Sequence, residues 1–285
     1  MNTIIKTFWL SAIIVVFSSL SVFAEKRPAT ADDEEDPYFI LTEEANRNIK
    51  EGQYLSAAER LREAIAMRPD APENVLLMSN LGLVYSYMDQ DSMAISVFDE
   101  ALRTAPSMRT VLTNRARVLL KMGRDVEAYK DLNRIIAVDS LDTEARYMHG
   151  LLAVGWGYLA DAEKDFAVLV ACAPEGIHTA VGMSTLLTAQ GKHTEALEYL
   201  RRLVDLSGLE EDYAALAASL IATDRLSEAS ETITSGLEKY PDSGELYFTR
   251  AQLNKARYSL DDAKADARKA LALGIEPARV ATLKL

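Results

Sequence analysis

One alanine recurs seven times along the chain at an almost constant interval. The steps between successive alanines are 37, 34, 34, 34, 33 and 34 residues, and a second small residue stands twelve positions before each of them. The alanines are Ala57, Ala94, Ala128, Ala162, Ala196, Ala229 and Ala263, and their partners are Ala45, Gly82, Ala116, Gly150, Ser184, Ala217 and Ala251. Small side chains are needed where two helices cross closely, because larger ones would push the helices apart. The pattern therefore predicts seven units, each a pair of crossing helices.

Two helical faces can be recognised between residues 75 and 108. In each of them the packing residues follow the spacing of one side of a helix. They are Met78, Leu81, Gly82 and Tyr85 in the first helix, and Ala94, Phe98 and Ala101 in the second. Pro106 follows the second face, where a helix must stop. The stretch is therefore predicted to be two helices joined by a short polar turn.

A helix–turn–helix unit of this length resembles the tetratricopeptide repeat. The resemblance implies an all-α fold, a right-handed superhelical solenoid of about seven repeats in which each repeat packs on its neighbours. We predict repeats 1 to 7 at about 38–71, 75–108, 109–142, 143–176, 177–210, 211–243 and 244–277, with a C-terminal cap or tail at 278–285.

The resemblance also implies a groove lined by the first helix of each repeat, where members of the family hold a peptide or a partner helix. Reading off the groove positions gives a mixture of aromatic, amide and cationic side chains, which suits a protein ligand. The predicted contacts are Phe39, Asn46, Lys50, Tyr87, Arg117, Lys121, Tyr147, Phe248, Gln252 and Lys255. The alternative is that several of these aromatic residues pack only against their neighbours.

One subtype of the family grips a peptide carboxylate with a clamp of lysine and asparagine residues. Asn114 stands at the position of the central asparagine of that clamp. The remaining positions do not match, and Glu144 would repel a carboxylate. The chain is therefore not expected to be a carboxylate-clamp protein.

The first 24 residues have the pattern of a cleavable secretory signal. Lys6 precedes a nearly apolar run from Phe8 to Phe23, and Val22 and Ala24 stand at the small-residue positions of a cleavage site. The alternative is an uncleaved membrane anchor, but the run is short of the about 20 residues that span a bilayer. No cysteine follows Ala24, so a lipid anchor at that point is not expected. The predicted location is outside the cytoplasm, in a periplasm, with secretion or membrane tethering as alternatives, and no integral span is expected after cleavage.

Residues 25–37 are polar and acidic and include two prolines. We predict a flexible leader, because such a segment has too little apolar surface to pack. The alternative is cation binding by the acidic run from Asp32 to Asp36. This alternative is disfavoured because the run has no turn-forming glycine, which a calcium loop needs.

The formal net charge of the chain is −12, and it becomes −13 if Lys6 leaves with the signal. A protein this acidic is a poor partner for nucleic acid, which is bound by clustered lysine and arginine. Cys172 is the only cysteine, so no intramolecular disulfide can form. It follows an apolar run near the end of a second helix, and we expect it to be buried rather than reactive.

Catalytic and metal-binding motifs were sought and not found. His149, His178 and His193 have no metal-ligand spacing, and there is no nucleophile elbow or phosphate-binding glycine loop. We therefore expect no catalytic, cofactor or metal site.

The function that these patterns favour is an exported adaptor or scaffold that binds protein partners in its groove. Two alternatives stay open at this stage: a permanent structural or assembly subunit of a cell-envelope complex, and a regulatory partner of a cell-wall enzyme. The sequence identifies neither the partner nor the oligomeric state.

Overall fold

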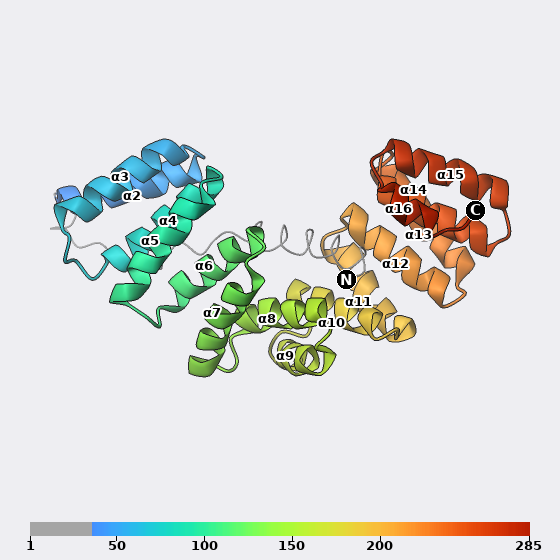
Figure 1. Cartoon of the computed structure of the whole chain (residues 1–285), viewed down its shortest axis with the longest axis horizontal. Coiled ribbons are helices and arrows are strands. Elements are labelled where there is room, and N and C mark those ends of the chain that lie inside the picture. Colours follow the sequence, from blue (N-terminus) through green and yellow to red (C-terminus); the bar gives the residue numbers. More distant parts are fainter. Residues whose placement is uncertain (1–35) are drawn as a thin grey trace. The chain divides into compact units, whose positions relative to one another are not determined.

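The structure is a computed structural model that describes residues 36–285. This part of the chain contains fifteen helices and no strand (Figure 1). The helices are α2 (Pro37–Lys50), α3 (Tyr54–Met67), α4 (Asn74–Tyr87), α5 (Asp91–Thr104), α6 (Arg109–Lys121), α7 (Asp125–Val138), α8 (Thr143–Trp156), α9 (Leu159–Cys172), α10 (Ile177–Ala189), α11 (His193–Leu206), α12 (Glu210–Ala222), α13 (Leu226–Lys239), α14 (Gly244–Ala256), α15 (Leu260–Ala272) and α16 (Pro277–Ala281). The predicted all-α class is confirmed. The predicted secretory signal and residues 25–35 of the predicted leader lie outside the described residues.

The described chain divides into two compact units, residues 36–145 and residues 146–285. In the first unit, α2 packs on α3, α4 on α5 and α6 on α7, while α4 also contacts α6. In the second unit the same pairing joins α10 to α11, α12 to α13 and α14 to α15, and α12 contacts α14. First helices thus pack on their own partners, and at α4–α6 and α12–α14 the first helices of successive pairs also touch.

The seven recurring alanines lie where the sequence predicts them, at the crossings of the helix pairs. All seven have an exposed fraction of 0%. Their small partners on the first helices are also fully packed, and Gly82 and Gly150 have the tightest surroundings. A Cβ atom on either glycine would lie 2.5 Å from the nearest ring carbon of Phe98 or Phe166, respectively. The two glycines are therefore required by the phenylalanine rings that face them.

Asp36 and Pro37 belong to the first helix rather than to the predicted leader. The Asp36 carboxylate accepts a hydrogen bond from the Tyr38 backbone N–H, which caps α2, and Pro37 occupies the first helical turn. Asp36 also pairs with Arg68 at the end of the first helix pair. The carboxylate that ends the acidic run is thus part of the fold.

The prediction that Cys172 is buried is wrong. Cys172 is the last residue of α9 and is exposed. Val138 and Leu206, the last residues of α7 and α11, are exposed as well although both are apolar. The final residue of a second helix extends past the crossing, so an apolar residue at this position is not covered.

Candidate partner-binding faces

The first candidate site lies in residues 36–145, on the surface where α4 and α6 meet. We call it the α4–α6 face and define it by Ser79, Asn80, Tyr87, Asn114 and Arg117. Four of these five side chains are polar and nevertheless buried, and Tyr87 is half-buried. Buried polar side chains are uncommon unless their hydrogen bonds are satisfied. Their concentration on two neighbouring first helices distinguishes this face from the alanine crossings behind it.

Two atoms of the α4–α6 face have no hydrogen-bond partner among residues 36–285. The Asn114 amide nitrogen donates to the Ser79 hydroxyl at 3.0 Å, but the Asn114 Oδ1 atom has no donor. The Nε atom of Arg117, a side chain only 4% exposed, has no acceptor. Each such atom costs about 1–3 kcal/mol of folding free energy. Since the two residues stand three apart on α6, they lie on one side of the helix.

The Arg117 guanidinium is bound to a carboxylate through one of its terminal nitrogen atoms. Its Nη2 atom hydrogen-bonds to the half-buried carboxylate of Glu144, which also pairs with Arg109. Arg109 pairs in addition with Asp142. Burial alone would raise the pKa of the Asp142 carboxyl, but hydrogen bonds from Arg109 and from the Ala145 N–H hold it below its usual value. This group of ion pairs fixes the direction of the Arg117 side chain.

Tyr87 packs on Tyr54, which begins α3. The two rings are stacked, with centroids 5.0 Å apart and planes 19° apart. Burial and the neighbouring Tyr54 raise the pKa of Tyr87 to about 12, and Arg117 opposes this increase. The Tyr87 hydroxyl is therefore neutral at physiological pH and can donate a hydrogen bond.

Lys121 was predicted to contact a partner, but its ammonium group is used within the chain. It donates to the Ser86 carbonyl, to Asp89 and to Asp91, each at 3.0 Å. Burial alone would lower the pKa of Lys121, but Asp89 and Asp91 outweigh this effect and hold the pKa above its usual value. Since an ammonium group has three donors, Lys121 links α6 to the turn after α4.

The three predicted contacts on α2 lie along one side of that helix. Phe39 is half-buried and packs edge-on against Tyr38, with ring centroids 5.3 Å apart. Asn46 is half-buried and Lys50 is exposed. Phe39 and Lys50 are eleven residues apart, which is about 16 Å along a helix. These residues extend the first-helix surface but do not belong to the α4–α6 face.

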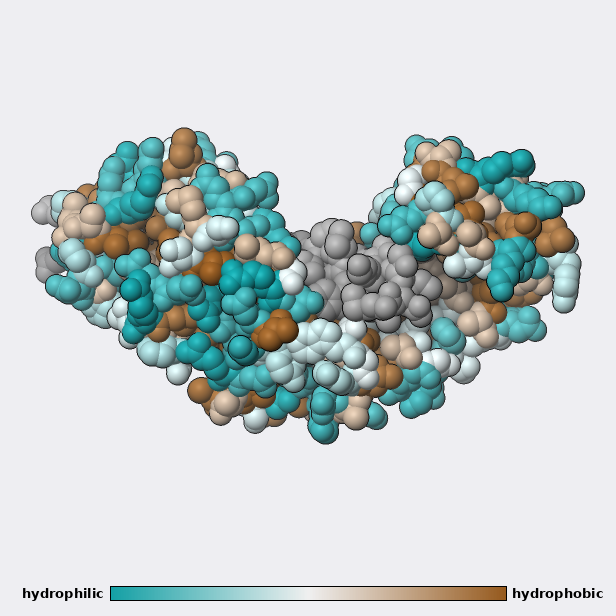
Figure 2. Space-filling view, in the orientation of Figure 1, coloured by the Kyte–Doolittle hydropathy of each residue, from teal (hydrophilic) through white to brown (hydrophobic). Residues whose placement is uncertain are grey.

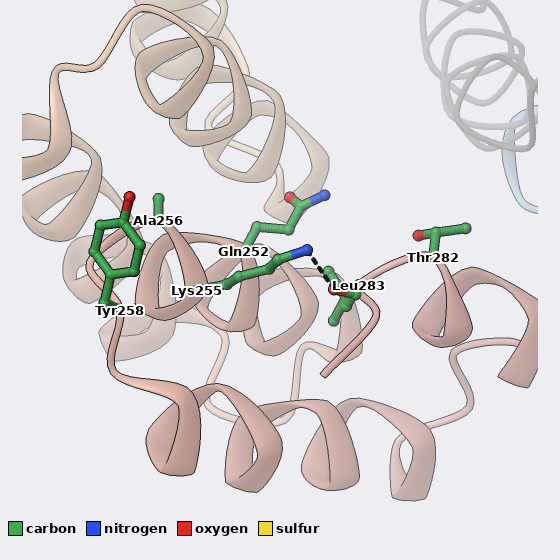
Figure 3. Close-up of a pocket in the computed structure, with 6 residues that line it drawn as sticks. All are labelled: Gln252, Lys255, Ala256, Tyr258, Thr282 and Leu283. Carbon is green, nitrogen blue, oxygen red and sulfur yellow. Dashed lines mark hydrogen bonds between the residues drawn. The ribbon is translucent and has the colours of Figure 1, made fainter.

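In residues 146–285 the predicted contacts fall into two groups. Tyr147 is fully buried and stacks on His178, with ring centroids 4.2 Å apart. Phe248 is also buried, whereas Gln252 and Lys255 line an open cavity on α14 (Figure 3). Tyr147 and Phe248 thus pack within the fold, as the alternative interpretation of the aromatic residues anticipated.

The sequence patterns do not single out Asn80, and they mark Asn114 only as the central residue of a carboxylate clamp. Asn80 and Asn114 stand 34 residues apart, so the same residue type occupies the same place in successive repeats. That repetition of a polar residue at a buried position was the signal available.

On the face visible in Figure 2, the described residues form no single large apolar patch that would indicate a docking site. Figure 2 shows polar residues over most of this face of each unit, with small separate apolar spots between them. Within residues 36–285 no helix is long and apolar enough to cross a membrane. The same residues contain no group of three or more His, Cys, Asp or Glu side chains that could hold a metal ion.

Seven helix pairs whose first helices carry polar side chains define the class of protein, an α-helical repeat scaffold. The family pattern of the tetratricopeptide repeat matches residues 77–112. The chain is 30% identical over 220 residues to the tetratricopeptide repeat and J domain-containing co-chaperone DNJ1 of Cryptococcus neoformans. The match covers 75% of this chain and 39% of that protein, so the chain spans about two fifths of the relative.

Two solved structures have a similar fold. A tetratricopeptide repeat protein from Parabacteroides merdae superposes with a TM-score of 0.69 at 23% identity, covering 87% of this chain and 97% of that one. PilW, described as a widely conserved type IV pilus biogenesis factor, gives a TM-score of 0.65 at 18% identity, covering 76% and 98%. These similarities show that the chain has the fold of tetratricopeptide-repeat proteins, and the family pattern itself is matched over residues 77–112.

Proposed function

We propose that the protein is an exported adaptor that binds an extended segment of a partner protein on the α4–α6 face. The observation that carries this proposal is the pair of unpartnered atoms on α6, the Oδ1 atom of Asn114 and the Nε atom of Arg117. One is an acceptor and the other is a donor. A backbone amide group of a partner offers the complementary N–H and C=O groups.

Binding through these atoms would recover a free energy that the free protein lacks. A partner N–H would donate to Asn114, and a partner C=O would accept from Arg117. Tyr87, half-buried on the same face, would then contact a side chain of the partner. Because Arg117 is already held by Glu144, little ordering is needed for it on binding.

The proposal also predicts how binding proceeds. Both unpartnered atoms lie beneath the molecular surface, so neighbouring side chains must move before a partner reaches them. Association that needs such a rearrangement is slower than docking of preformed surfaces. The relative named as a co-chaperone supports a polypeptide partner for this chain.

The test is crosslinking in the native organism, followed by affinity purification and mass spectrometry. The variant combines Asn114→Ala with Arg117→Lys, since lysine keeps the positive charge but has no Nε donor. The matched control combines Asn133→Ala with Arg134→Lys on α7, where both side chains are exposed. Loss of a defined partner from the face variant only, with the helical content of both variants retained, is the expected result.

An unchanged set of partners in the face variant would overturn the proposal. Recovery of the protein in a fixed-ratio complex that survives both variants would favour a structural subunit instead. Export is tested separately by fractionation and N-terminal sequencing. The expected mature N-terminus is Glu25, the residue after the proposed cleavage site.

A further inference from the structure

Helix α14 carries a row of four side chains on one side. Glu245, Phe248, Gln252 and Lys255 follow one another at intervals of three and four residues, which is the spacing of a single helix face. We call this row the α14 face. Three of its members are predicted partner contacts. In the structure, part of this face is covered by the chain itself, by residues 277–285.

The covering segment binds through two side chains. Arg279 forms two hydrogen bonds to the Glu245 carboxylate, with Nη2 2.8 Å from Oε2, and its guanidinium lies 4.9 Å from the centre of the Phe248 ring. Leu283 is 4% exposed and belongs to a core cluster with Phe248. The Lys255 ammonium donates to the Leu283 carbonyl, as Figure 3 shows.

These contacts reveal the chemistry that the α14 face accepts. A bidentate arginine–carboxylate pair with the guanidinium over an aromatic ring is a strong and geometrically specific contact. The leucine four residues later adds apolar burial, and it lies in the turn that follows the end of α16 at Ala281. The face therefore accepts a short segment with an arginine followed, four residues on, by an apolar residue.

The covering segment leaves a cavity at the other end of the face. Its volume is about 480 Å³, and it is lined by Gln252, Lys255, Ala256, Tyr258, Thr282 and Leu283 (Figure 3). Tyr258 and Thr282 stand at opposite ends of the labelled group in this view, with Gln252 and Lys255 between them. The segment thus fills one part of the face and leaves room for further residues in the other.

Tyr258 is an unusual residue for its position. It is 89% exposed and has a φ of +62°, in the left-handed region. The equivalent turn positions in the other repeats are occupied by residues that tolerate this region more readily, namely Gly52, Asp89, Gly123, Gly157, Gly191 and Asp224. A tyrosine at such a site is strained and makes little buried contact, so its ring is available to a ligand at the cavity.

We propose that the α14 face is a second docking site, which binds a short segment of a partner protein containing an arginine and an apolar residue four positions later. Residues 277–285 are its displaceable internal occupant. A partner segment takes their place on Glu245 and Phe248 and extends along the face to Tyr258. This site lies in residues 146–285 and does not depend on the α4–α6 face.

The test uses a fluorescently labelled peptide with the sequence of residues 276–285 and follows its anisotropy. The chain lacking residues 277–285 is expected to bind the peptide at least about tenfold more tightly than the full chain, because the tethered segment competes at millimolar effective concentration. A full-length chain with Arg279→Ala and Leu283→Ala should bind the peptide as tightly as the truncated chain. This variant replaces the truncated chain in the measurement if truncation prevents folding. Lys284→Ala, on the exposed part of the same segment, is the matched control and should behave like the unmodified chain.

A peptide carrying the same two alanine substitutions should bind none of these proteins. The proposal is overturned if the unmodified peptide binds neither the truncated chain nor the chain with Arg279→Ala and Leu283→Ala, while these chains keep their helical content. Equal binding of the peptide to these two chains and to the unmodified full-length chain would also overturn it. None of these measurements involves Asn114 or Arg117, so they fail or succeed independently of the proposed adaptor function.

Tyr258→Gly tests the cavity end of the face. Glycine removes the backbone strain, so the melting temperature should stay the same or rise. Binding of the 276–285 peptide to the truncated chain should stay the same, because this segment leaves the cavity open. A peptide lengthened so that its added residues reach the cavity should bind the Tyr258→Gly chain about three- to tenfold more weakly. Unchanged affinity of the lengthened peptide would exclude Tyr258 from the site.

Discussion

Repeats 2 and 3 are neighbours with the same register, but they fill their helix crossings differently. In repeat 2 the first helix has Gly82, and the second helix places the Phe98 ring against it. In repeat 3 the corresponding residues are Ala116 and Leu132, both fully buried. A smaller residue on one helix is matched by a larger one on the other. What the two repeats share is therefore the volume filled at the crossing, and not the identity of either residue.

The two repeats differ again at the residues that directly precede this contact. Leu81 and Val97 in repeat 2 correspond to Arg115 and Asp131 in repeat 3. Arg115 donates twice to the buried Asp131 carboxylate, at 2.7 and 2.6 Å. Two apolar residues in one repeat and a bidentate ion pair in the next thus occupy the same positions in the fold. The comparison indicates that this second position tolerates a change of chemistry when both members change together.

Removing the ring of Phe98 from the helix crossing of repeat 2 should have the largest effect on the free energy of unfolding. Phe98→Ala is expected to lower the free energy of unfolding by about 3–5 kcal/mol, because it removes buried surface and leaves a cavity. Urea unfolding followed by circular dichroism measures the change. The control is Val97→Ala on the same helix, where the side chain is half-buried and the expected loss is about 1 kcal/mol. Equal losses in the two variants would contradict the packing described here.

Adding a methyl group to the same crossing should have the next largest effect on the free energy of unfolding. Gly82→Ala places a methyl group within 2.5 Å of the Phe98 ring and is expected to cost about 1–3 kcal/mol. Adding Phe98→Leu reproduces the combination of repeat 3. The double variant should then lose less than about 1.5 kcal/mol relative to the unmodified protein. Simple addition of the two single losses would show that the residues do not compensate each other.

Breaking the ion pair of repeat 3 should have a moderate effect. Asp131→Ala is expected to cost about 1–3 kcal/mol, because Arg115 keeps only the more exposed Asp99 as its partner. The combination of Arg115→Leu and Asp131→Val copies repeat 2. It should be neutral or stabilising, since desolvating two charges offsets much of their attraction. If the double variant in the same urea assay is less stable than Asp131→Ala, the two chemistries are not equivalent.

The smallest effect is expected at Cys172, which lies beyond every crossing. Cys172→Ser should change the free energy of unfolding by less than about 0.5 kcal/mol, as is usual for exposed positions. A maleimide probe should label the native protein without denaturant. Labelling that appears only after unfolding would contradict the exposed position of the thiol.

The fold was predictable because its main requirement is local and repeated. A small residue at each crossing and apolar residues on two helix faces determine the pairing, and both can be recognised from spacing alone. The position of Cys172 was not predictable in the same way. The apolar run before it resembles a buried face, but burial also depends on how far the neighbouring helices extend.

The candidate sites were only partly predictable, for a related reason. The repeat register identifies which residues point away from the crossings, and this is how Arg117, Gln252 and Lys255 were found. It does not reveal which internal partners those residues acquire. Lys121 is occupied by acceptors that are 30 to 35 residues away in the sequence. The segment that covers the α14 face contains no repeat pattern, so its role followed only from the contacts of Arg279 and Leu283.

The matched pair of glycine and phenylalanine has a consequence for how such a chain can be lengthened or rearranged. Both members of each pair lie within a single repeat, so copying a complete helix pair carries the match along with it. Exchanging one helix alone would bring a ring against a methyl group, or leave a gap beside a glycine. The Phe166 ring also faces Gly182, on α10 of the following repeat, where a Cβ atom would lie 2.7 Å from the ring. A whole helix pair is therefore a better unit to duplicate or transplant than a single helix, but α8–α9 also needs a glycine on the first helix that follows it.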